Sequence, residues 1–314
     1  MHAATASRVE RTPLYRFVAP RYWRVWLILA VMRLMYALPL RLQRALGARA
    51  GRLALRLLHE RPEIARRNLA VCFPELSETE RETLLVRHFE SLGIAIFETA
   101  VVWWAPDARL RALAEPEGLE HLQAALARGK GALMFSAHFT CLEMGARLLC
   151  LYTPLHVMYR AHENPLWEEI LRRGRDRHAE KVIRRQDVRQ LIRSLRDNKA
   201  VWFAPDQAPR PSKDTALVPF FHEDAVTNTS TSRIAQITGA AVLPYFPERL
   251  ADGRYRLIIG ASLENFPSDD HVADAARLNA LIEARAREVP EQYLWIHRRF
   301  KGRPSPYRDL YAGL

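Results

Sequence analysis

From residue 118 onward, short apolar runs of strand length alternate with longer stretches of helical periodicity. The apolar runs lie at residues 132–135, 155–159, 200–203, 241–246 and 255–259. The predicted helices lie at residues 119–127, 142–149, 164–177, 188–196, 226–238 and 272–288. Strands that alternate with helices of this length form a largely parallel sheet covered by helices. The pattern therefore predicts an α/β fold, with a largely parallel central sheet flanked by helices.

Polar residues follow three of the predicted strands. His138 comes after the strand at 132–135, Arg160 after the next strand, and Asp206 after the strand at 200–203. Parallel sheets bind ligands at the carboxyl ends of their strands. We therefore expect these three side chains at one edge of the sheet, around a ligand site.

His138 lies at a strand-to-helix junction, and Glu143 follows it in the first turns of the helix. A carboxylate that orients an imidazole and stabilises its protonated form is half of a nucleophile-activating arrangement, and a substrate hydroxyl can supply the other half. We expect Glu143 to face back towards His138; an ordinary structural hydrogen bond is the alternative. We interpret Ser136 as a strand-end hydrogen bonder and Cys141 as a small buried apolar residue, rather than as nucleophiles.

The sequence lacks the motifs of several other classes of enzyme. It has no HExxH, no Cys/His cluster, no GxSxG elbow and no GxxxxGK[ST] loop. Its three cysteines form no CxxC pair, which favours reduced thiols in a domain that faces the cytosol. We therefore expect neither a metal nor a cofactor.

Basic residues dominate the charge of the chain. The net charge is +12, and 47 Arg and Lys residues face 35 Asp and Glu residues. Such a balance suits a polyanion or an anionic membrane surface, although base-composition bias in the gene would also enrich Arg. A dense run contains Arg172, Arg173, Arg175, Arg177, Arg184 and Arg185. It is interpreted as a docking surface for an acidic protein or anionic headgroups, with a solvated face as the alternative. No nucleic-acid-binding module is recognisable, so we expect no nucleic acid partner.

The N-terminal part divides into three segments. Residues 1–20 are polar, basic and Pro-containing, which is typical of a poorly ordered leader. Residues 21–47 hold an apolar stretch that Arg33 interrupts, shorter than the ~20 residues that a membrane span needs. Its basic flanks, with Trp23 and Trp26, predict a membrane-associated helix at the interface, and an ordinary buried helix is the alternative. Residues 48–117 are predicted as a helical region packed on the core at 118–314.

Five segments, in order along residues 15–306, resemble one known family. They are RNLAVCFP at 67–74, SAHFTCLE at 136–143, YRAHENPL at 159–166 leading into RRGR at 172–175, APDQ at 204–207 followed by VPFF at 218–221, and YLWIHRRFKGRP at 293–304. The chain resembles the lysophospholipid/lipid A acyltransferase family, the late acyltransferases of lipopolysaccharide assembly. The resemblance implies a glycerolipid-acyltransferase-like α/β enzyme at the cytoplasmic face of the bacterial inner membrane. It also implies an acyl carrier protein thioester as donor and a hydroxyl of a lipid A precursor as acceptor.

By the same resemblance, the HxxxxD/E motif places the catalytic pair at His138 and Glu143. Arg160, Asp206 and Gln207 become substrate-binding candidates. For Arg160, phosphate binding and oxyanion stabilisation both stay open. The backbone N–H groups after His138 are the other candidates for stabilising the oxyanion. We expect Asp206 to order its own loop or Arg160. His222 stands where the family commonly has Gly, which leaves the acceptor and the acyl length open. An acyltransferase with another acceptor, such as a lysophospholipid or an amino-acid lipid, and a non-catalytic basic membrane-binding protein are the alternatives.

Overall fold

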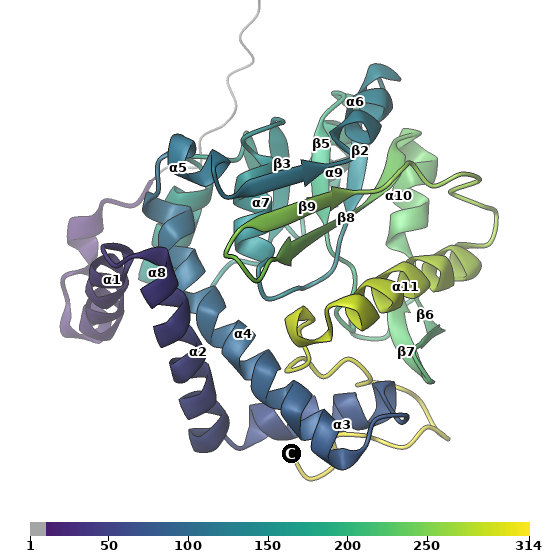
Figure 1. Ribbon diagram of the computed structural model, residues 1–314. Coiled ribbons are helices and arrows are strands. Elements are labelled where there is room, and N and C mark those ends of the chain that lie inside the picture. The colour runs from purple at the N-terminus through teal and green to yellow at the C-terminus, as the bar shows by residue number, and fades with distance from the viewer. Residues whose placement is uncertain (1–10) are drawn as a thin grey trace, which may run out of the picture.

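The computed structural model describes residues 11–314, which fold around one seven-stranded sheet (Figure 1). The strand order is β1-β9-β8-β2-β5-β3-β4. The five predicted strands are β2 (Ala132–Phe135), β3 (Leu155–Tyr159), β5 (Ala200–Phe203), β8 (Ala241–Arg249) and β9 (Tyr255–Ile259). Strands β8, β2, β5, β3 and β4 run parallel to one another, and only the β8–β9 pairing within this sheet is antiparallel. The prediction of a largely parallel sheet is confirmed.

Four strands were not predicted. β1 (Ala114–Glu117) and β4 (Lys181–Arg184) form the two edges of the sheet, and their short, charged sequences carry no apolar run. β6 (Thr215–Phe220) and β7 (Glu223–Asn228) form a separate antiparallel hairpin. The predicted helix at 226–238 is therefore wrong at its start, because residues 226–228 pair with β6 and the helix begins at Ser230.

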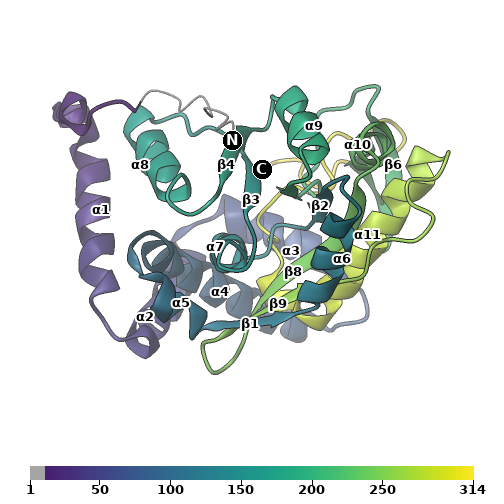
Figure 2. The same ribbon diagram turned by 90° about the horizontal axis from the view of Figure 1, so that it is seen from above.

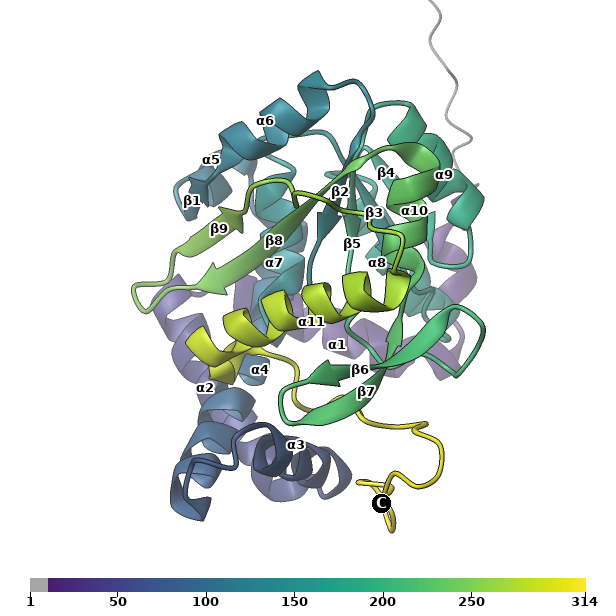
Figure 3. The same cartoon turned by 90° about the vertical axis from the view of Figure 1, so that its right-hand side faces the viewer.

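Helices flank the sheet as predicted. They are α6 (Leu119–Ala127), α7 (Leu142–Leu149), α8 (Pro165–Arg175), α9 (Val188–Arg196), α10 (Ser230–Thr238) and α11 (His271–Glu288). Asn164 caps α8 by accepting from the N–H groups of Leu166 and Trp167, and Pro165 occupies the first turn. α11 and the β6–β7 hairpin lie side by side (Figure 3), because Asn279 of α11 donates to the carbonyl of Pro219.

The predicted single helix at 21–47 is wrong: the segment contains α1 (Trp23–Tyr36) and the start of α2 (Leu40–Leu57). Pro39 separates the two helices, since a proline lacks the N–H that a continuous helix would need. α1 lies at the margin of the molecule beside α8 (Figure 2). Within residues 11–314, no helix combines the length and the apolar character required to cross a bilayer.

The prediction of a poorly ordered leader is wrong where the structure describes it, from residue 11 to residue 20. Residues 1–10 lie outside the described residues, but η1 (Leu14–Phe17) and η2 (Pro20–Tyr22) are short 3-10 helices. Phe17 and Tyr22 are buried together with Leu166 of α8. This small apolar cluster fixes the chain that leads into α1.

The predicted helical region contains α3 (Glu60–Cys72), α4 (Glu78–Trp104) and α5 (Asp107–Arg111). Ser77 and Glu80 form the capping box that starts α4. α2 crosses α4 in close contact, since a Cβ atom on Gly51 would lie 1.9 Å from the carbonyl oxygen of Phe89. α3, α4 and the sheet share one hydrophobic core. The long helix α4 can therefore contact the loops at the carboxyl edge of the sheet.

Candidate active site

The loop that follows β2 carries His138 to the carboxyl edge of the sheet. The N–H of Ser136 donates to the carbonyl of Phe203 (2.9 Å), so β2 and β5 stay paired up to their ends. Asp206 lies in the loop after β5. Its Oδ2 accepts the backbone N–H of His138 (2.9 Å), and its Oδ1 lies 2.5 Å from His138 Nδ1. The predicted meeting of His138 and Asp206 at one edge of the sheet is confirmed.

Asp206 and His138 each stabilise the charged form of the other. Burial raises the pKa of Asp206, but the charge and hydrogen bonds of His138 outweigh it, and the pKa lies below its usual value. Burial lowers the pKa of His138, but Asp206 and then Glu143 outweigh it, and the pKa lies above its usual value. An ionised carboxylate only accepts hydrogen bonds. Nδ1 of His138 therefore carries the proton, which leaves Nε2 as the basic nitrogen of the neutral ring.

Glu143 does not orient His138, and that prediction is wrong. Its carboxylate pairs with the guanidinium of Arg175, which also lies 5.6 Å from the centre of the Tyr159 ring. The reason is topological: Glu143 lies in the first turn of α7, where it faces α8, while the neighbouring strand β5 delivers Asp206 to the imidazole. Glu143 still acts on the ring at longer range, because its charge contributes to the raised pKa of His138.

Arg160 and Gln207 lie nearby without joining the pair. The side chain of Arg160 is 69% exposed, and its ion pair with Glu163 is long, at 3.8 Å. Asp206 therefore does not order Arg160 but binds His138. Gln207 is half-buried next to Asp206.

Three backbone N–H groups in the loop after β2 already have acceptors. Those of His138, Phe139 and Thr140 donate to Asp206, to Ala137 and to Gln292. These three groups are therefore not free oxyanion donors, and an oxyanion role for the N–H groups at the start of α7 stays a prediction. Arg160 presents an exposed cationic side chain at this edge.

The C-terminal segment closes the site from the side opposite to the sheet. The N–H of Leu294 donates to the carbonyl of His138 (3.0 Å), and Tyr293 forms a β-bridge with Phe139. His297 accepts the N–H of Ala208 (3.2 Å), two residues after Asp206. Burial lowers the pKa of His297 to about 4, so its ring is neutral and can accept at Nε2. Both loops of the pair thus rest on one segment.

Asn68 fixes that segment from the helical region. Its amide donates to the carbonyls of Trp295 (2.6 Å) and His297 (2.8 Å), and its oxygen accepts from Tyr311 (2.5 Å). Residues 67–74 and 293–304 both belong to the segments that resemble the family, but the sequence does not predict their contact. An Asn among the apolar positions of a helix is a signal that could have indicated it, because a buried amide needs hydrogen-bond partners.

Neither Ser136 nor Cys141 is placed as a nucleophile. Ser136 is fully buried, and its hydroxyl has no hydrogen-bond partner within residues 11–314. Burial raises the pKa of Cys141 to about 12, so its thiol stays protonated. The interpretation of Cys141 as a small buried residue is confirmed.

The sequence of the chain matches one family of known proteins. Residues 12–302 match the model described as bacterial lipid A biosynthesis acyltransferase. The chain is 41% identical over 297 residues to the lipid A biosynthesis palmitoleoyltransferase of Escherichia coli (strain K12), covering 94% of this chain and 96% of that protein. It is 39% identical over 294 residues to the lauroyltransferase of the same organism, covering 93% and 96%. Identity to the myristoyltransferase is lower, at 28% over 307 residues, covering 94% of each protein.

Proposed function

Because the chain belongs to the bacterial lipid A biosynthesis acyltransferase family, we propose that it acylates a hydroxyl of a lipid A precursor, with an acyl carrier protein thioester as donor. The His138–Asp206 pair at the carboxyl edge of the sheet is the observation that supports this reaction. A buried carboxylate that holds a partly exposed imidazole provides a general base for an alcohol. The reaction needs neither a metal nor a cofactor.

The proposed mechanism is direct transfer without an acyl-enzyme. Nε2 of His138 removes the proton of the acceptor hydroxyl while its oxygen attacks the thioester carbonyl carbon. The C–S bond then breaks, and the imidazolium returns the proton to the leaving thiolate. Asp206 fixes the tautomer and stabilises the imidazolium, as a triad carboxylate does. General-base assistance of this kind contributes typically ~10²–10⁴ in rate.

Glu143 and Arg175 act on the same step from farther away. The negative charge of Glu143 favours the imidazolium form of His138. Arg175 holds that carboxylate in place, because the two side chains are paired. Arg160 and Gln207 are proposed to bind the substrates, and Arg160 to contact an anionic group, since a guanidinium suits phosphate or carboxylate.

The basic run on and after α8 is proposed to dock the acidic carrier protein, but with fewer residues than the sequence indicated. Arg172 and Arg173 pair with Glu169, and Arg175 pairs with Glu143. The exposed members are Arg177, Arg184 and Arg185. Charge complementarity with an acidic partner favours this surface, because it speeds association.

The N-terminal helices are proposed to hold the enzyme at the cytoplasmic face of the inner membrane. α1 exposes Trp23, Leu27, Ile28, Val31 and Leu34. The outer face of α2 adds exposed leucines among arginines, at Arg49, Arg52, Leu53, Arg56 and Leu57. Apolar side chains among basic ones suit a helix that lies in the interface of an anionic bilayer. Trp26 packs inward instead, because its indole donates to the carbonyl of Phe17.

Mass spectrometry of lipid A from cells with and without this protein tests the proposed function. We expect one acyl chain fewer on lipid A when the protein is absent, and its return with the wild-type gene but not with a His138→Gln variant. An unchanged acylation pattern would exclude lipid A as the product and would favour an acyltransferase with another acceptor. Incubation of the purified enzyme with a lysophospholipid in place of the lipid A precursor would then identify that acceptor class.

A further inference from the structure

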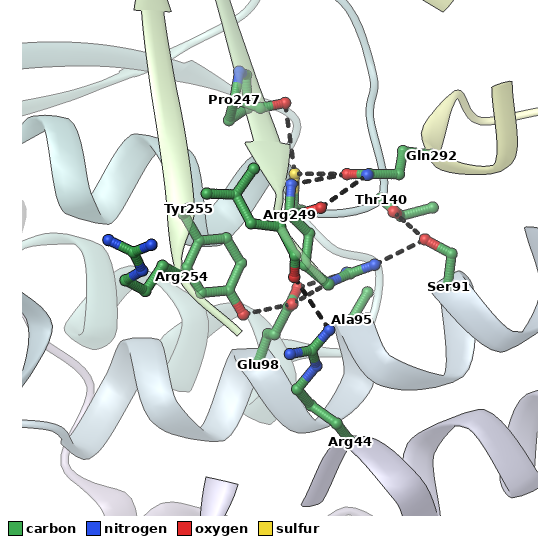
Figure 4. Close-up of polar contacts among 12 residues, drawn as sticks. Arg44, Ser91, Ala95, Glu98, Thr140, Pro247, Arg249, Arg254, Tyr255 and Gln292 are labelled. Atoms are coloured by element: carbon green, nitrogen blue, oxygen red, sulfur yellow. Dashed lines mark hydrogen bonds and ion pairs between the residues drawn. The ribbon is translucent and has the colours of Figure 1, made fainter. Parts of the chain in front are cut away.

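Figure 4 shows a buried ion pair between Glu98 and Arg249, which is linked through Ser91 to Thr140. Glu98 of α4 receives two hydrogen bonds from Arg249 at the end of β8, from Nε to Oε1 and from Nη2 to Oε2 (2.8 Å). The hydroxyl of Tyr255 donates to the same carboxylate (2.6 Å). Glu98 and Arg249 are only 4% and 7% exposed. The pair therefore lies deep between α4 and the sheet.

From this ion pair, a chain of side chains reaches the catalytic loop. Nη1 of Arg249 donates to Ser91 Oγ (2.7 Å), and Ser91 Oγ lies 2.7 Å from Thr140 Oγ1. Because Arg249 can only donate, Ser91 accepts from it, and either hydroxyl can be the donor between Ser91 and Thr140. Figure 4 shows Ser91 between the guanidinium and Thr140, in that order.

A second arm reaches Thr140 through the backbone. The side-chain amide of Gln292 accepts the N–H of Arg249 (2.8 Å) and donates to its carbonyl (3.0 Å). The backbone carbonyl of Gln292 accepts the N–H of Thr140 (2.7 Å). Thr140 is thus fixed at its hydroxyl and at its amide, two residues beyond His138.

We propose that the side chain of Thr140, held by Ser91 and Arg249, is a positioning device that keeps His138 in its productive place against Asp206. This inference rests on the proposed acyl transfer at His138. A buried ion pair can often be replaced by apolar residues without loss of stability. The contribution of the Glu98–Arg249 pair proposed here is to positioning, because Arg249 holds Ser91, and Ser91 is hydrogen-bonded to Thr140 in the loop that carries His138. A displacement of about 1 Å at a reacting group can cost up to ~10²-fold in rate.

Two substitutions of Thr140 separate positioning from bulk structure. Thr140→Val keeps the shape and removes the hydroxyl, and we expect kcat to fall about tenfold, within the cost of a misplaced base. KM for the carrier protein and for the lipid acceptor should not change, because the proposed role of Thr140 is to position His138 and not to bind substrate. Thr140→Ser keeps the hydroxyl and should restore most of the loss. Thr99→Val is the matched control, because that hydroxyl only bonds the carbonyl of Ala95 within α4.

The imidazole of His138 provides a readout that does not depend on activity. Asp206, Glu143 and His297 are the ionisable groups whose charges act on it, and none is altered by these substitutions. If Thr140→Val loosens the contact with Asp206, NMR of ¹⁵N-labelled histidine should show a lower pKa for His138 than in wild type. His138→Gln assigns the signal, and Thr140→Ser and Thr99→Val should keep the wild-type pKa.

A wild-type pKa for His138 together with a wild-type kcat in Thr140→Val would overturn the proposal. If that variant does not fold, Ser91→Ala decides, since it cuts the same chain and leaves Thr140 in place. Ser91→Ala should lower both kcat and the His138 pKa, and wild-type values for both would also overturn the proposal. A wild-type enzyme that transfers no acyl chain would refute the proposed function instead, while the NMR comparison would still decide the positioning.

Discussion

Nδ1 of His138 lies 2.5 Å from Oδ1 of Asp206, a residue 68 positions further along the chain. Two adjacent parallel strands, β2 and β5, bring these residues together. The carboxylate that holds the imidazole of His138 therefore comes from the Pro-Asp-Gln loop and not from the His-x-x-x-x-Glu motif. This relationship leads to the following predictions.

Asp206→Asn should lower both the rate and the pH at which the rate reaches half of its maximum. The base acts as a neutral imidazole, so activity rises as the pH passes through the pKa of His138. Wild-type His138 has a raised pKa because Asp206 and Glu143 outweigh burial. Without the Asp206 charge, burial lowers the pKa, and kcat/KM should reach half of its maximum at lower pH. The plateau should fall by about 10²–10⁴, the usual contribution of a general base. Asp252→Asn, in an exposed turn, should leave the profile unchanged.

Glu143→Gln should cost less than Asp206→Asn. Glu143 acts on His138 only through its charge and is bonded to Arg175, whereas Asp206 holds both the ring and the backbone N–H. Single-turnover rates of the two variants at the same pH give the comparison. A larger loss in Glu143→Gln would return the orienting role to Glu143.

Asn68→Ala should destabilise the protein by about 3 kcal/mol, because more than one buried partner loses its hydrogen bond and each such loss costs ~1–3 kcal/mol. The partners are the carbonyls of Trp295 and His297 and the hydroxyl of Tyr311. Urea denaturation measures the change in the free energy of unfolding. Arg66→Ala on the same helix removes an exposed pair with Glu82, and should cost less than about 1 kcal/mol. Equal losses in the two variants would contradict the proposed role of Asn68.

Leu27→Glu with Val31→Glu should reduce binding to vesicles that contain anionic lipid, since both side chains are exposed on α1. Co-sedimentation with the vesicles measures the bound fraction. Ile237→Glu on α10 is the control, because that side chain is also exposed but its helix lies on the other side of the molecule (Figure 1). Undiminished binding by the double variant would remove α1 from the proposed membrane contact.

The sequence contains enough information to predict most strands of the sheet, but not which side chains from different loops contact one another at its edge. Apolar runs such as Leu155–Tyr159 have the bounds of the observed strands, because central parallel strands are buried on both faces. The edge strands β1 and β4 were not predicted from apolar runs, because they are partly exposed and carry charged residues. His138 and Asp206 were both identified from their positions after strands. Their bond was not, because strand order decides which loops are neighbours and a single sequence does not give that order.

The contacts that brace the site are also long-range. Thr140 meets Ser91 of α4, and His297 meets Ala208 across the site. No local pattern links such pairs, because each lies in its own element and the fold brings them together. The preference of Glu143 for Arg175 has the same origin, since α8 approaches α7 only in the folded chain.

The most direct measurement is acyl transfer by the purified protein from a radiolabelled acyl carrier protein thioester to a lipid A precursor. We predict that label appears in the lipid product with the wild-type protein, and that His138→Gln reduces the rate by at least about 10²-fold. Label that stays on the carrier protein with wild type, or that moves equally fast with His138→Gln, would contradict His138 as the base for this transfer.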